Sequence, residues 1–171
     1  FCPSGYHYKR LRHRPLKVMS EKKTSLAVAA LQAGTVIDHI PSDALFRVAH
    51  ILGIENMANG VTIGNNLPSS RGGKKGIIKV EGIEFDREVL NRIAVIAPTA
   101  TVNIIRDYDV VSKHTVELPR TLIGTMRCPN PKCITNNEPM ATRFDVANPD
   151  TPSFRCHYCN HTVAGADAEI I

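Results

Sequence analysis

The sequence predicts an α+β fold: an N-terminal, mainly antiparallel sheet with two helices on one face, in a ferredoxin-like arrangement, followed by a small all-β domain of the zinc-ribbon kind. Two observations predict it. Up to residue 118, short alternating segments typical of strands are interrupted by two segments of helical periodicity. Beyond it, large apolar side chains are few and four cysteines cluster within 128–159, so this part needs a metal to hold it together.

The first predicted elements are two strands, 26–30 and 35–40, around a turn at Ala33-Gly34. Pro41-Ser42 then opens a helix, and Gly53 stands where its C-terminal cap belongs. The helix has one apolar face with i, i+3, i+4, i+7 spacing, made by Leu45, Val48, Ala49 and Leu52.

Two more strands, 61–66 and 77–81, are separated by a loop at 69–76. Asp86 can cap a second helix, which Pro98 stops. Each helix is expected to connect neighbouring strands of one sheet.

The last strands of this sheet are predicted at 101–106 and 110–116, around a turn at 107–109. An antiparallel sheet commonly carries helices on one face and leaves the other open. Alternation places Asn103 and an exposed Ile105 on the open face. That face is either solvated or a binding surface, and periodicity alone favours the solvated one.

Charge and composition suggest the domain limits. Residues 1–18 carry five basic and no acidic residues and so account for the whole net charge of +5. We expect them to lie outside the native fold, with Met19 as the natural start; the alternative is a genuine basic arm. Leu118-Pro119 is the expected boundary between domains at 19–118 and 119–171. The remaining residues, 19–171, carry no net charge, which argues against a nucleic-acid partner. The sequence has no apolar run of roughly 20 residues, which argues against a membrane-spanning helix.

The cysteines follow the pattern C-x4-C-x22-C-x2-C. Two closely spaced pairs suit one structural zinc ion per chain, because four thiolates fill its tetrahedral shell and leave no position for water. An iron–sulfur cluster, or a redox role for the second pair, is the alternative. Thiolate ligands also indicate a reducing, cytoplasmic location. The predicted ligands are Cys128, Cys133, Cys156 and Cys159.

Several motifs follow one another along the chain: GTVIDHIP at 34–41, IGNNLPS at 63–69, IKVE at 78–81, AP and ATVN within 97–103, YDVVSK at 108–113, CPN at 128–130 and CxYC at 156–159. Together they closely resemble the regulatory chain of aspartate carbamoyltransferase. The resemblance runs from about residue 24 to the C-terminus, and residues 1–18 have no counterpart.

The resemblance implies a non-catalytic subunit of pyrimidine biosynthesis. Its first domain would bind CTP, an inhibitor assisted by UTP, or ATP, an activator. Its zinc domain would dock on the catalytic chain, in an assembly of six catalytic and six regulatory chains that contains regulatory-chain dimers. The implied nucleotide site consists of Asp38, His39, Lys79, Asn103, Ile105, Tyr108, Val110 and Lys113.

The implied roles are chemically reasonable. Lys113 and His39 would supply positive charge to the triphosphate, and Asp38 with Lys79 would hold the ribose hydroxyls. Backbone groups near Ile105 and Tyr108 would read the base.

The resemblance also implies docking contacts from Asn130 and Tyr158. The chain departs from the family at Lys132, where a second asparagine is usual, and at Asn160, where a glutamate is usual. Two other functions remain as alternatives. A nucleic-acid-binding zinc ribbon would need the basic arm, and an enzyme would need a nucleophile–base pair that the sequence does not offer.

The effector signal would have to cross the junction between the two domains. We expect a packed junction containing Leu118, Leu122, Ile123 and Met126. A polar substitution at Leu122 or Ile123 is therefore predicted to uncouple nucleotide binding from the partner's response.

Overall fold

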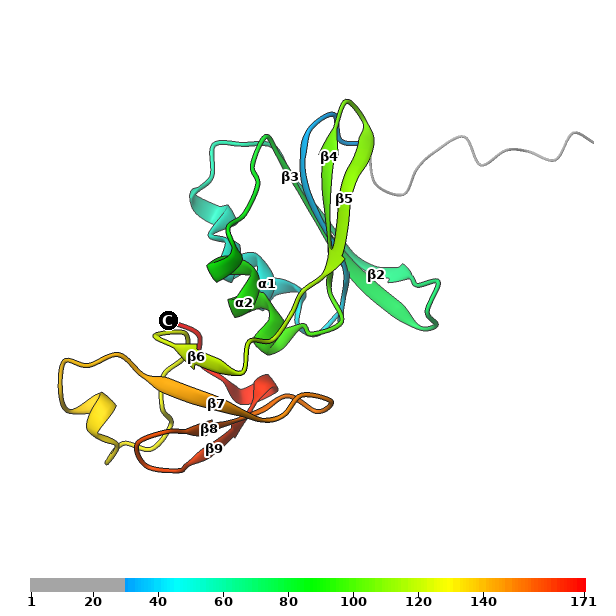
Figure 1. The fold of residues 1–171 in the computed structure, drawn as a ribbon. Coiled ribbons are helices and arrows are strands. Elements are labelled where there is room, and N and C mark those ends of the chain that lie inside the picture. Colours follow the sequence, from blue (N-terminus) through cyan, green and yellow to red (C-terminus); the bar gives the residue numbers. More distant parts are fainter. Residues whose placement is uncertain (1–29) are drawn as a thin grey trace, which may run out of the picture.

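The computed structural model describes residues 30–171, which form two antiparallel sheets stacked end to end (Figure 1). The first sheet has five strands in the spatial order β2-β3-β1-β4-β5. These strands are β1 (Gly34–Ile40), β2 (Val61–Pro68), β3 (Lys74–Glu81), β4 (Thr101–Arg106) and β5 (Asp109–Thr115). The basic segment 1–18, the suggested start at Met19 and all but Ala30 of the predicted strand 26–30 lie outside the described residues, and Ala30 is not in a strand.

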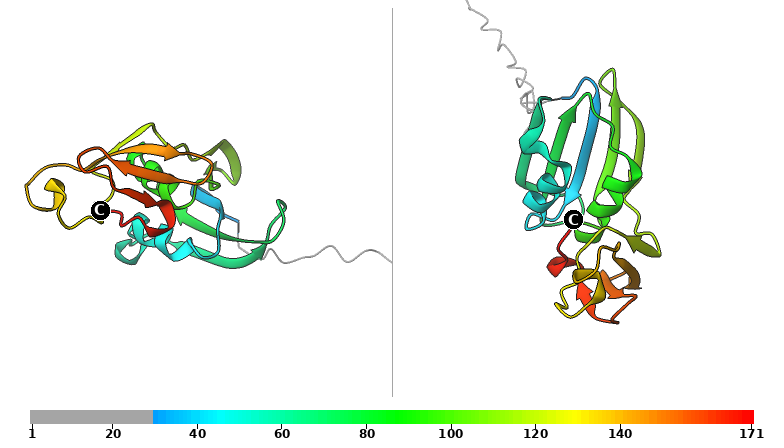
Figure 2. Two further views of the ribbon diagram at one scale, coloured as in Figure 1. Left: turned by 90° about the horizontal axis from the view of Figure 1, so that it is seen from below. Right: turned by 90° about the vertical axis from the view of Figure 1, so that its left-hand side faces the viewer.

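Two helices, α1 (Leu45–Leu52) and α2 (Arg87–Ile96), cover one face of this sheet (Figure 2). The prediction that each helix joins neighbouring strands is wrong. Strand β3 lies between β1 and β2, and β1 lies between β3 and β4. The reason is that β1 and β2 both run antiparallel to β3 and are therefore parallel to each other, and parallel strands need a crossover. This split arrangement is the ferredoxin-like one, and the predicted α+β class is confirmed.

Helix α1 begins at Leu45, later than Pro41-Ser42, because 42–44 form a turn closed by the Ala44 N–H on the Pro41 carbonyl. Gly53 ends the helix in the left-handed conformation with φ 66°, as predicted. The predicted cap of α2 is also confirmed, because the Asp86 carboxylate accepts the Val89 N–H at 2.9 Å.

The first half of the predicted loop 69–76 is a loop, but 74–76 are not. Lys74 and Lys75 pair with Pro68 and Leu67 of β2, and Gly76 pairs with Ile40, so strand β3 starts at Lys74. Because this end of the strand consists of two lysines and a glycine, it has no alternation of apolar and polar residues, and the sequence pattern did not predict it.

The second sheet has four strands in the order β6-β7-β8-β9. After β9, the short 3₁₀ helix η3 leads to the C-terminus, and a single bridge joins Ile170 to Met126. The elements are β6 (Thr121–Ile123), β7 (Arg143–Asn148), β8 (Ser153–Cys156), β9 (Thr162–Ala164) and η3 (Gly165–Asp167). Of the helices in residues 30–171, none has the length and apolarity to span a bilayer.

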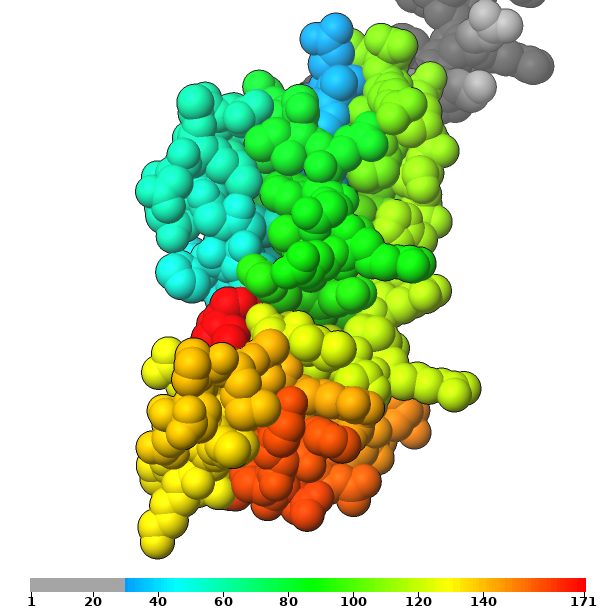
Figure 3. Space-filling model, turned by 60° about the vertical axis from the view of Figure 1, so that its left-hand side comes forward, coloured from blue at the N-terminus to red at the C-terminus, as the bar shows by residue number. Residues whose placement is uncertain are grey.

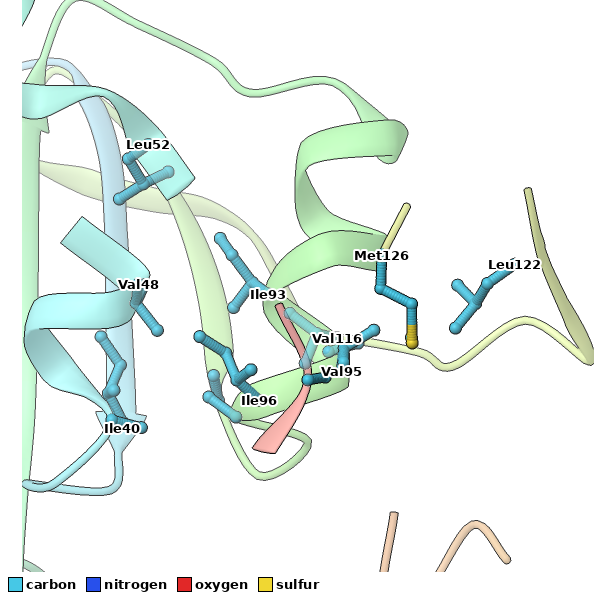
Figure 4. Close-up of a cluster of buried hydrophobic side chains, with 14 of the residues drawn as sticks. Ile40, Val48, Leu52, Ile93, Val95, Ile96, Val116, Leu122 and Met126 are labelled. Atoms are coloured by element: carbon cyan, nitrogen blue, oxygen red, sulfur yellow. The ribbon is translucent and has the colours of Figure 1, made fainter. Parts of the chain in front are cut away.

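One hydrophobic core extends from the first sheet into the second. Leu122 and Met126 are buried in the same cluster as Val95 and Ile96 of α2 (Figure 4). Ile123, predicted at this junction, is 67% exposed instead. Because β6 alternates, only one of two adjacent residues can face α2.

A second, smaller apolar cluster lies on the other face of the five-stranded sheet. It contains Ile105, Val36 and Leu31, with Ile77 packed against it. The prediction of an exposed Ile105 is therefore wrong, because the segment that precedes β1 contributes Leu31 to this cluster. The face without helices is partly apolar and partly polar.

Candidate functional site

The four cysteines come together from two turns of the second sheet. Their sulfur atoms all lie within 4.8 Å of one another. The sulfurs of Cys128 and Cys159 are 3.6 Å apart, and those of Cys133 and Cys156 are 3.8 Å apart. Zinc–thiolate bonds of about 2.3 Å give a tetrahedron with edges of about 3.8 Å. The four sulfurs therefore fit one tetrahedral metal ion with no open position.

The surroundings of the sulfurs are suited to a metal site. Burial raises the pKa of Cys128 and of Cys156. Burial acts the same way on Cys159, but hydrogen bonds from the backbone of His161 and the side chain of Asn130 outweigh it and lower that pKa to about 7. Buried thiols with raised pKa values need a bound cation to become ligands together.

The loop between the first two cysteines is held by side chains that sequence reasoning missed. Thr135 donates its hydroxyl to the Cys133 sulfur at 3.2 Å. Asn136 donates to the carbonyls of Cys128 and Asn130, both at 2.8 Å, and Asn137 donates to that of Cys133 at 2.8 Å. Such contacts orient metal ligands. A run of short polar residues just after a cysteine is the signal that could have revealed them.

The residues proposed for docking lie within the two cysteine turns or next to them. Asn130 is partly committed inside its loop, where its side-chain oxygen accepts the Lys132 N–H at 3.1 Å. Tyr158 is 40% exposed and stacks edge-on against His157. Lys132 is exposed, and Asn160 is exposed with a left-handed backbone, φ 60°.

On the first sheet, several of the predicted nucleotide residues form one row. Strand pairing aligns Lys79 with Val36, Val36 with Asn103, and Asn103 with Lys113. These residues share the face that has no helices. Residues that are paired in register lie about 5 Å apart across strands, so two lysines and an amide are lined up across this face, with the amide next to Lys113.

An irregularity in β5 sets which of its residues reach this face. Lys113 pairs with Asn103 and Val110 pairs with Ile105, although they are an odd number of residues apart. The register shifts between Ile104 and Ile105, which leaves Val111 as the extra residue of a bulge. Without the bulge, Val110 and Lys113 would lie on opposite faces.

Beside the middle of this row, at one end of strand β1, Asp38 and His39 adjoin a lysine that sequence analysis assigned to a loop. Lys75 Nζ lies 2.7 and 2.8 Å from the two carboxylate oxygens of Asp38. The Asp38 carboxylate also accepts the His39 N–H at 2.7 Å, and His39 has a left-handed backbone, φ 57°. The His39 ring is partly buried, and its Nδ1 lies 3.4 Å from an Asp38 carboxylate oxygen without hydrogen-bond geometry, so both buried ring nitrogens are without a hydrogen-bond partner.

The electrostatics of this end are dominated by positive charge. Burial lowers the pKa of His39, and the charges of Lys75, Arg71 and Lys113 lower it further, while Asp38 opposes them. Burial also lowers the pKa of Lys79. Burial acts to raise the pKa of Asp38, but the hydrogen bonds from Lys75 and His39 prevail and lower it. An anion bound here would reverse the unfavourable contributions on the cations.

The other three predicted residues lie at the far end of the β4–β5 hairpin. Ile105 is buried, whereas Val110 and Tyr108 are 57% and 65% exposed. Tyr108 is in the turn, where Asp107 and Tyr108 both have positive φ, and its N–H donates to the Gln32 carbonyl at 3.0 Å. Its N–H is therefore engaged with the chain itself. The predicted set is thus divided into a charged end and an apolar end on one face of the sheet.

Comparison with known proteins covers both sheets. The family model "Aspartate carbamoyltransferase regulatory chain, allosteric domain" matches residues 26–117, and the corresponding "metal binding domain" model matches residues 120–169. The chain is 54% identical over 153 residues to the aspartate carbamoyltransferase regulatory chain of Bacteroides fragilis, covering 90% of this chain and 100% of that one.

Two further relatives bear the same name. The regulatory chain of Porphyromonas gingivalis is 52% identical over 150 residues, covering 88% of this chain and 99% of that one. The regulatory chain of Pyrococcus horikoshii is 48% identical over 140 residues, covering 81% and 92%. The similarity therefore extends over nearly the full length of these proteins.

Proposed function

Since the chain belongs to the family of aspartate carbamoyltransferase regulatory chains, we propose that it binds nucleoside triphosphates on its first sheet and docks on a catalytic chain through its second. A regulatory chain is a non-catalytic subunit of its enzyme. Its allosteric part is proposed to comprise 19–118 and its metal-binding part 119–171. The observation that carries the nucleotide proposal is the presence of Lys75, Lys79 and Lys113 on one sheet face, with the half-buried His39 under the influence of Lys75 and Lys113.

The triphosphate is assigned to the charged end of this face. Lys113 is exposed and can donate directly to phosphate oxygens, whereas the unpartnered ring nitrogens of His39 are buried and donate to a phosphate only when the ring turns outward. Asp38 retains acceptor capacity on its oxygens and, with Lys79, is assigned to the ribose hydroxyls. Lys75 is added to the site, because it fixes the position of the Asp38 carboxylate.

The base is assigned to the apolar end. Ile105 and Val36 form a floor there with Leu31, and Val110 lies beside Ile105 across the strand pair. An apolar floor with backbone polar groups at its edge suits a flat heterocycle. Asn103 lies between the two ends and can donate to either the sugar or the phosphates. Tyr108 contributes its backbone carbonyl from the turn, because its N–H donates to Gln32.

The effects of the nucleotides are proposed from the family. CTP is assigned as the inhibitor, with UTP acting beside it, and ATP as the activator. The site supports one place for all three, because the phosphate-binding side chains do not depend on the base.

The metal is proposed to be zinc, one ion per chain, bound by Cys128, Cys133, Cys156 and Cys159. Four sulfur ligands in a closed tetrahedron support a structural role. The thiolates also support a reducing compartment, so the protein is assigned to the cytoplasm.

The docking surface is assigned to the Cys128–Cys133 loop and to Tyr158. A hollow beside the loop is lined by Arg127, Pro131, Met140 and Ile171, and it can receive a partner's side chains. Exposed Lys132 and Asn160 would change the polar contacts there, compared with the asparagine and glutamate implied by the family. The proposed assembly contains six catalytic and six regulatory chains, with the regulatory chains paired as dimers.

One experiment tests the whole proposal. The chain is co-expressed with the catalytic chain of its own organism, and the purified complex is assayed with CTP, UTP and ATP. We expect a stable complex whose activity falls with CTP and rises with ATP. A catalytic chain that purifies alone, or a complex indifferent to all three nucleotides, would overturn it.

A further inference from the structure

The C-terminal segment lies as a wedge between the two sheets. Figure 3 shows the last residues, in red, between the helices of the first sheet and the body of the second. Its contact with α1 is polar and specific. Arg47 donates from Nη1 to the Ala166 carbonyl at 2.7 Å and from Nη2 to the Ala168 carbonyl at 2.6 Å. Within residues 30–171 these two carbonyls are the partners of the guanidinium.

The chemistry of this contact favours arginine. The two carbonyls lie at the end of η3, where backbone acceptors have no partner within the helix. A guanidinium has a rigid fork of donors that can bind two acceptors at once, whereas an ammonium binds as a point. The side chain is only half exposed and Ala168 is buried, so water is partly excluded from the bond to Ala168, whereas the bond to Ala166 is exposed.

The other helix holds the same segment from the opposite side. A Cβ added to Gly165 would lie 2.4 Å from the Val95 carbonyl, near the end of α2. Backbone is therefore packed on backbone at this point. Helix α1 contacts η3 through Arg47 and α2 contacts it through close backbone packing, so both helices constrain the position of η3.

These contacts join the two candidate sites by a short path. Helix α1 follows directly on the end of β1 that carries Asp38 and His39. On the other side, η3 follows β9, and β9 pairs with β8, which ends at Cys156. Arg47 is the polar contact on this path.

We propose that Arg47 is a coupling residue that transmits the state of the nucleotide site to the metal-binding part through η3. The inference rests on the proposed function, because it names the route by which that site acts on the partner. If Arg47 had a purely structural role, it would contribute only to the stability of the fold. Loss of a coupling residue changes the partner's response to nucleotide and, by reciprocity, the effect of substrate on nucleotide affinity, while the nucleotide's affinity for the substrate-free complex stays the same.

The test uses the assembled complex with its catalytic chain. Arg47→Met removes both donors and keeps the apolar stem, and Arg47→Lys keeps the charge but not the fork. The matched control is Arg92→Met, since Arg92 is a half-buried arginine of α2 whose guanidinium pairs with Glu88 in its own helix at 2.9 Å. Each variant is measured for metal content, for CTP affinity by calorimetry, and for the CTP-induced and ATP-induced shifts in half-saturating substrate concentration.

Allosteric coupling typically changes affinity by about 5- to 150-fold. We expect Arg47→Met to lose most of the nucleotide-induced shift, Arg47→Lys to retain part of it, and Arg92→Met to retain all of it. Metal content and CTP affinity should match wild type in all three. If Arg47→Met does not assemble, the Arg47→Lys complex provides the test. A smaller nucleotide-induced shift in its half-saturating substrate concentration, at unchanged CTP affinity, supports the proposal.

Two outcomes overturn the inference, and they are distinguishable. A full response in an assembled Arg47→Met complex, or in Arg47→Lys if only that variant assembles, overturns the coupling role and leaves the proposed function intact. A wild-type complex that does not respond to any nucleotide overturns the proposed function and this inference together.

Discussion

At the scale of single residues, the charged groups at one end of the sheet face are affected by burial, which disfavours their charged forms, and by hydrogen bonds, which favour them. Burial works against the charge of Asp38, His39 and Lys79 alike. Asp38 stays ionised because Lys75 and the His39 backbone donate to it, and Lys75 is positioned by the same bond. The carboxylate thus positions one cation, Lys75, and Lys79 and Lys113 leave the cluster with a net positive charge for a ligand.

Lys113→Ala should weaken the binding of CTP and ATP to the same extent. The substitution removes a charge-assisted hydrogen bond worth about 1.5–3 kcal/mol, and both nucleotides carry the same triphosphate. Calorimetric titration with each nucleotide measures the two losses. A loss confined to one base would show that Lys113 contacts something other than the phosphates.

The affinity for CTP should rise as the pH falls below neutrality. The pKa of His39 is lowered from 6.5 in the free protein, and adjacent phosphates would raise it in the complex. Binding therefore takes up a proton between these two pKa values, so affinity increases as pH falls through the raised value and levels off below the lowered one. Titration of the wild type and of His39→Gln with the same nucleotide cancels the titration of the nucleotide itself. Equal slopes in the two proteins would contradict the role of His39.

At the scale of elements, the second sheet depends on its two cysteine turns. Strands β7 and β8 bury Phe144 and Phe154, but the other strands are short and half exposed. Structural zinc sites contribute an apparent 10–16 kcal/mol in small peptides, roughly the entire stability of an ordinary domain. Loss of the metal therefore removes enough free energy to unfold this part.

Replacing any one of the four cysteines with serine should unfold 119–171 and abolish docking on the catalytic chain. Residues of the first sheet should stay folded and continue to bind CTP, because their core has its own buried set around Ile37, Val48 and Ile93. Elemental analysis, hydrogen exchange and co-purification measure the three outcomes. As a milder control, Thr135→Val removes only the hydrogen bond to the Cys133 sulfur and should keep the metal. A serine variant that still docks would contradict a structural role for the metal.

Sequence patterns predicted elements well where local chemistry decides them. The apolar face of α1, its Gly53 cap and the Asp86 cap of α2 each depend on neighbours in the chain. Spacing alone also singled out the four cysteines that converge. Features that depend on strand pairing or on contacts between distant segments were not predicted. Lys75 was assigned to a loop because only its partners on β2 reveal a strand, and the buried state of Ile105 depends on Leu31 reaching it.

At the scale of the whole molecule, the two sheets share a core rather than meeting at a hinge. Met126, Leu122 and Ile96 belong to the same buried cluster, and Gly165 packs on the backbone of α2. A contact of this kind transmits displacement because close-packed interiors deform little. The sequence indicated an apolar junction but could not tell which of two adjacent residues faced inward.

Leu122→Ala should reduce the response of the catalytic partner to CTP and ATP, whereas Ile123→Ala should not. Leu122 is 2% exposed in the shared core, so truncation leaves a cavity at the junction and costs about 2–5 kcal/mol of stability. Ile123 is its exposed neighbour and provides the matched control. Both variants are compared for partner activity, CTP affinity and urea midpoint. An undiminished nucleotide response in the Leu122→Ala complex would mean that the signal does not pass through this core.

The bulge in β5 gives the strand one residue more than its pairing uses. Val111 is half exposed and is the residue without a partner on β4, so many side chains should be tolerated there. Deleting it would leave a regular strand in which Val110 still pairs with Ile105 and Lys113 still pairs with Asn103. One residue can therefore be lost between Val110 and Lys113 without turning Lys113 toward the helix-covered face. The spacing between the base and the phosphates of a bound nucleotide would be set by β4, where Ile105 and Asn103 are two residues apart, and not by the number of residues in β5.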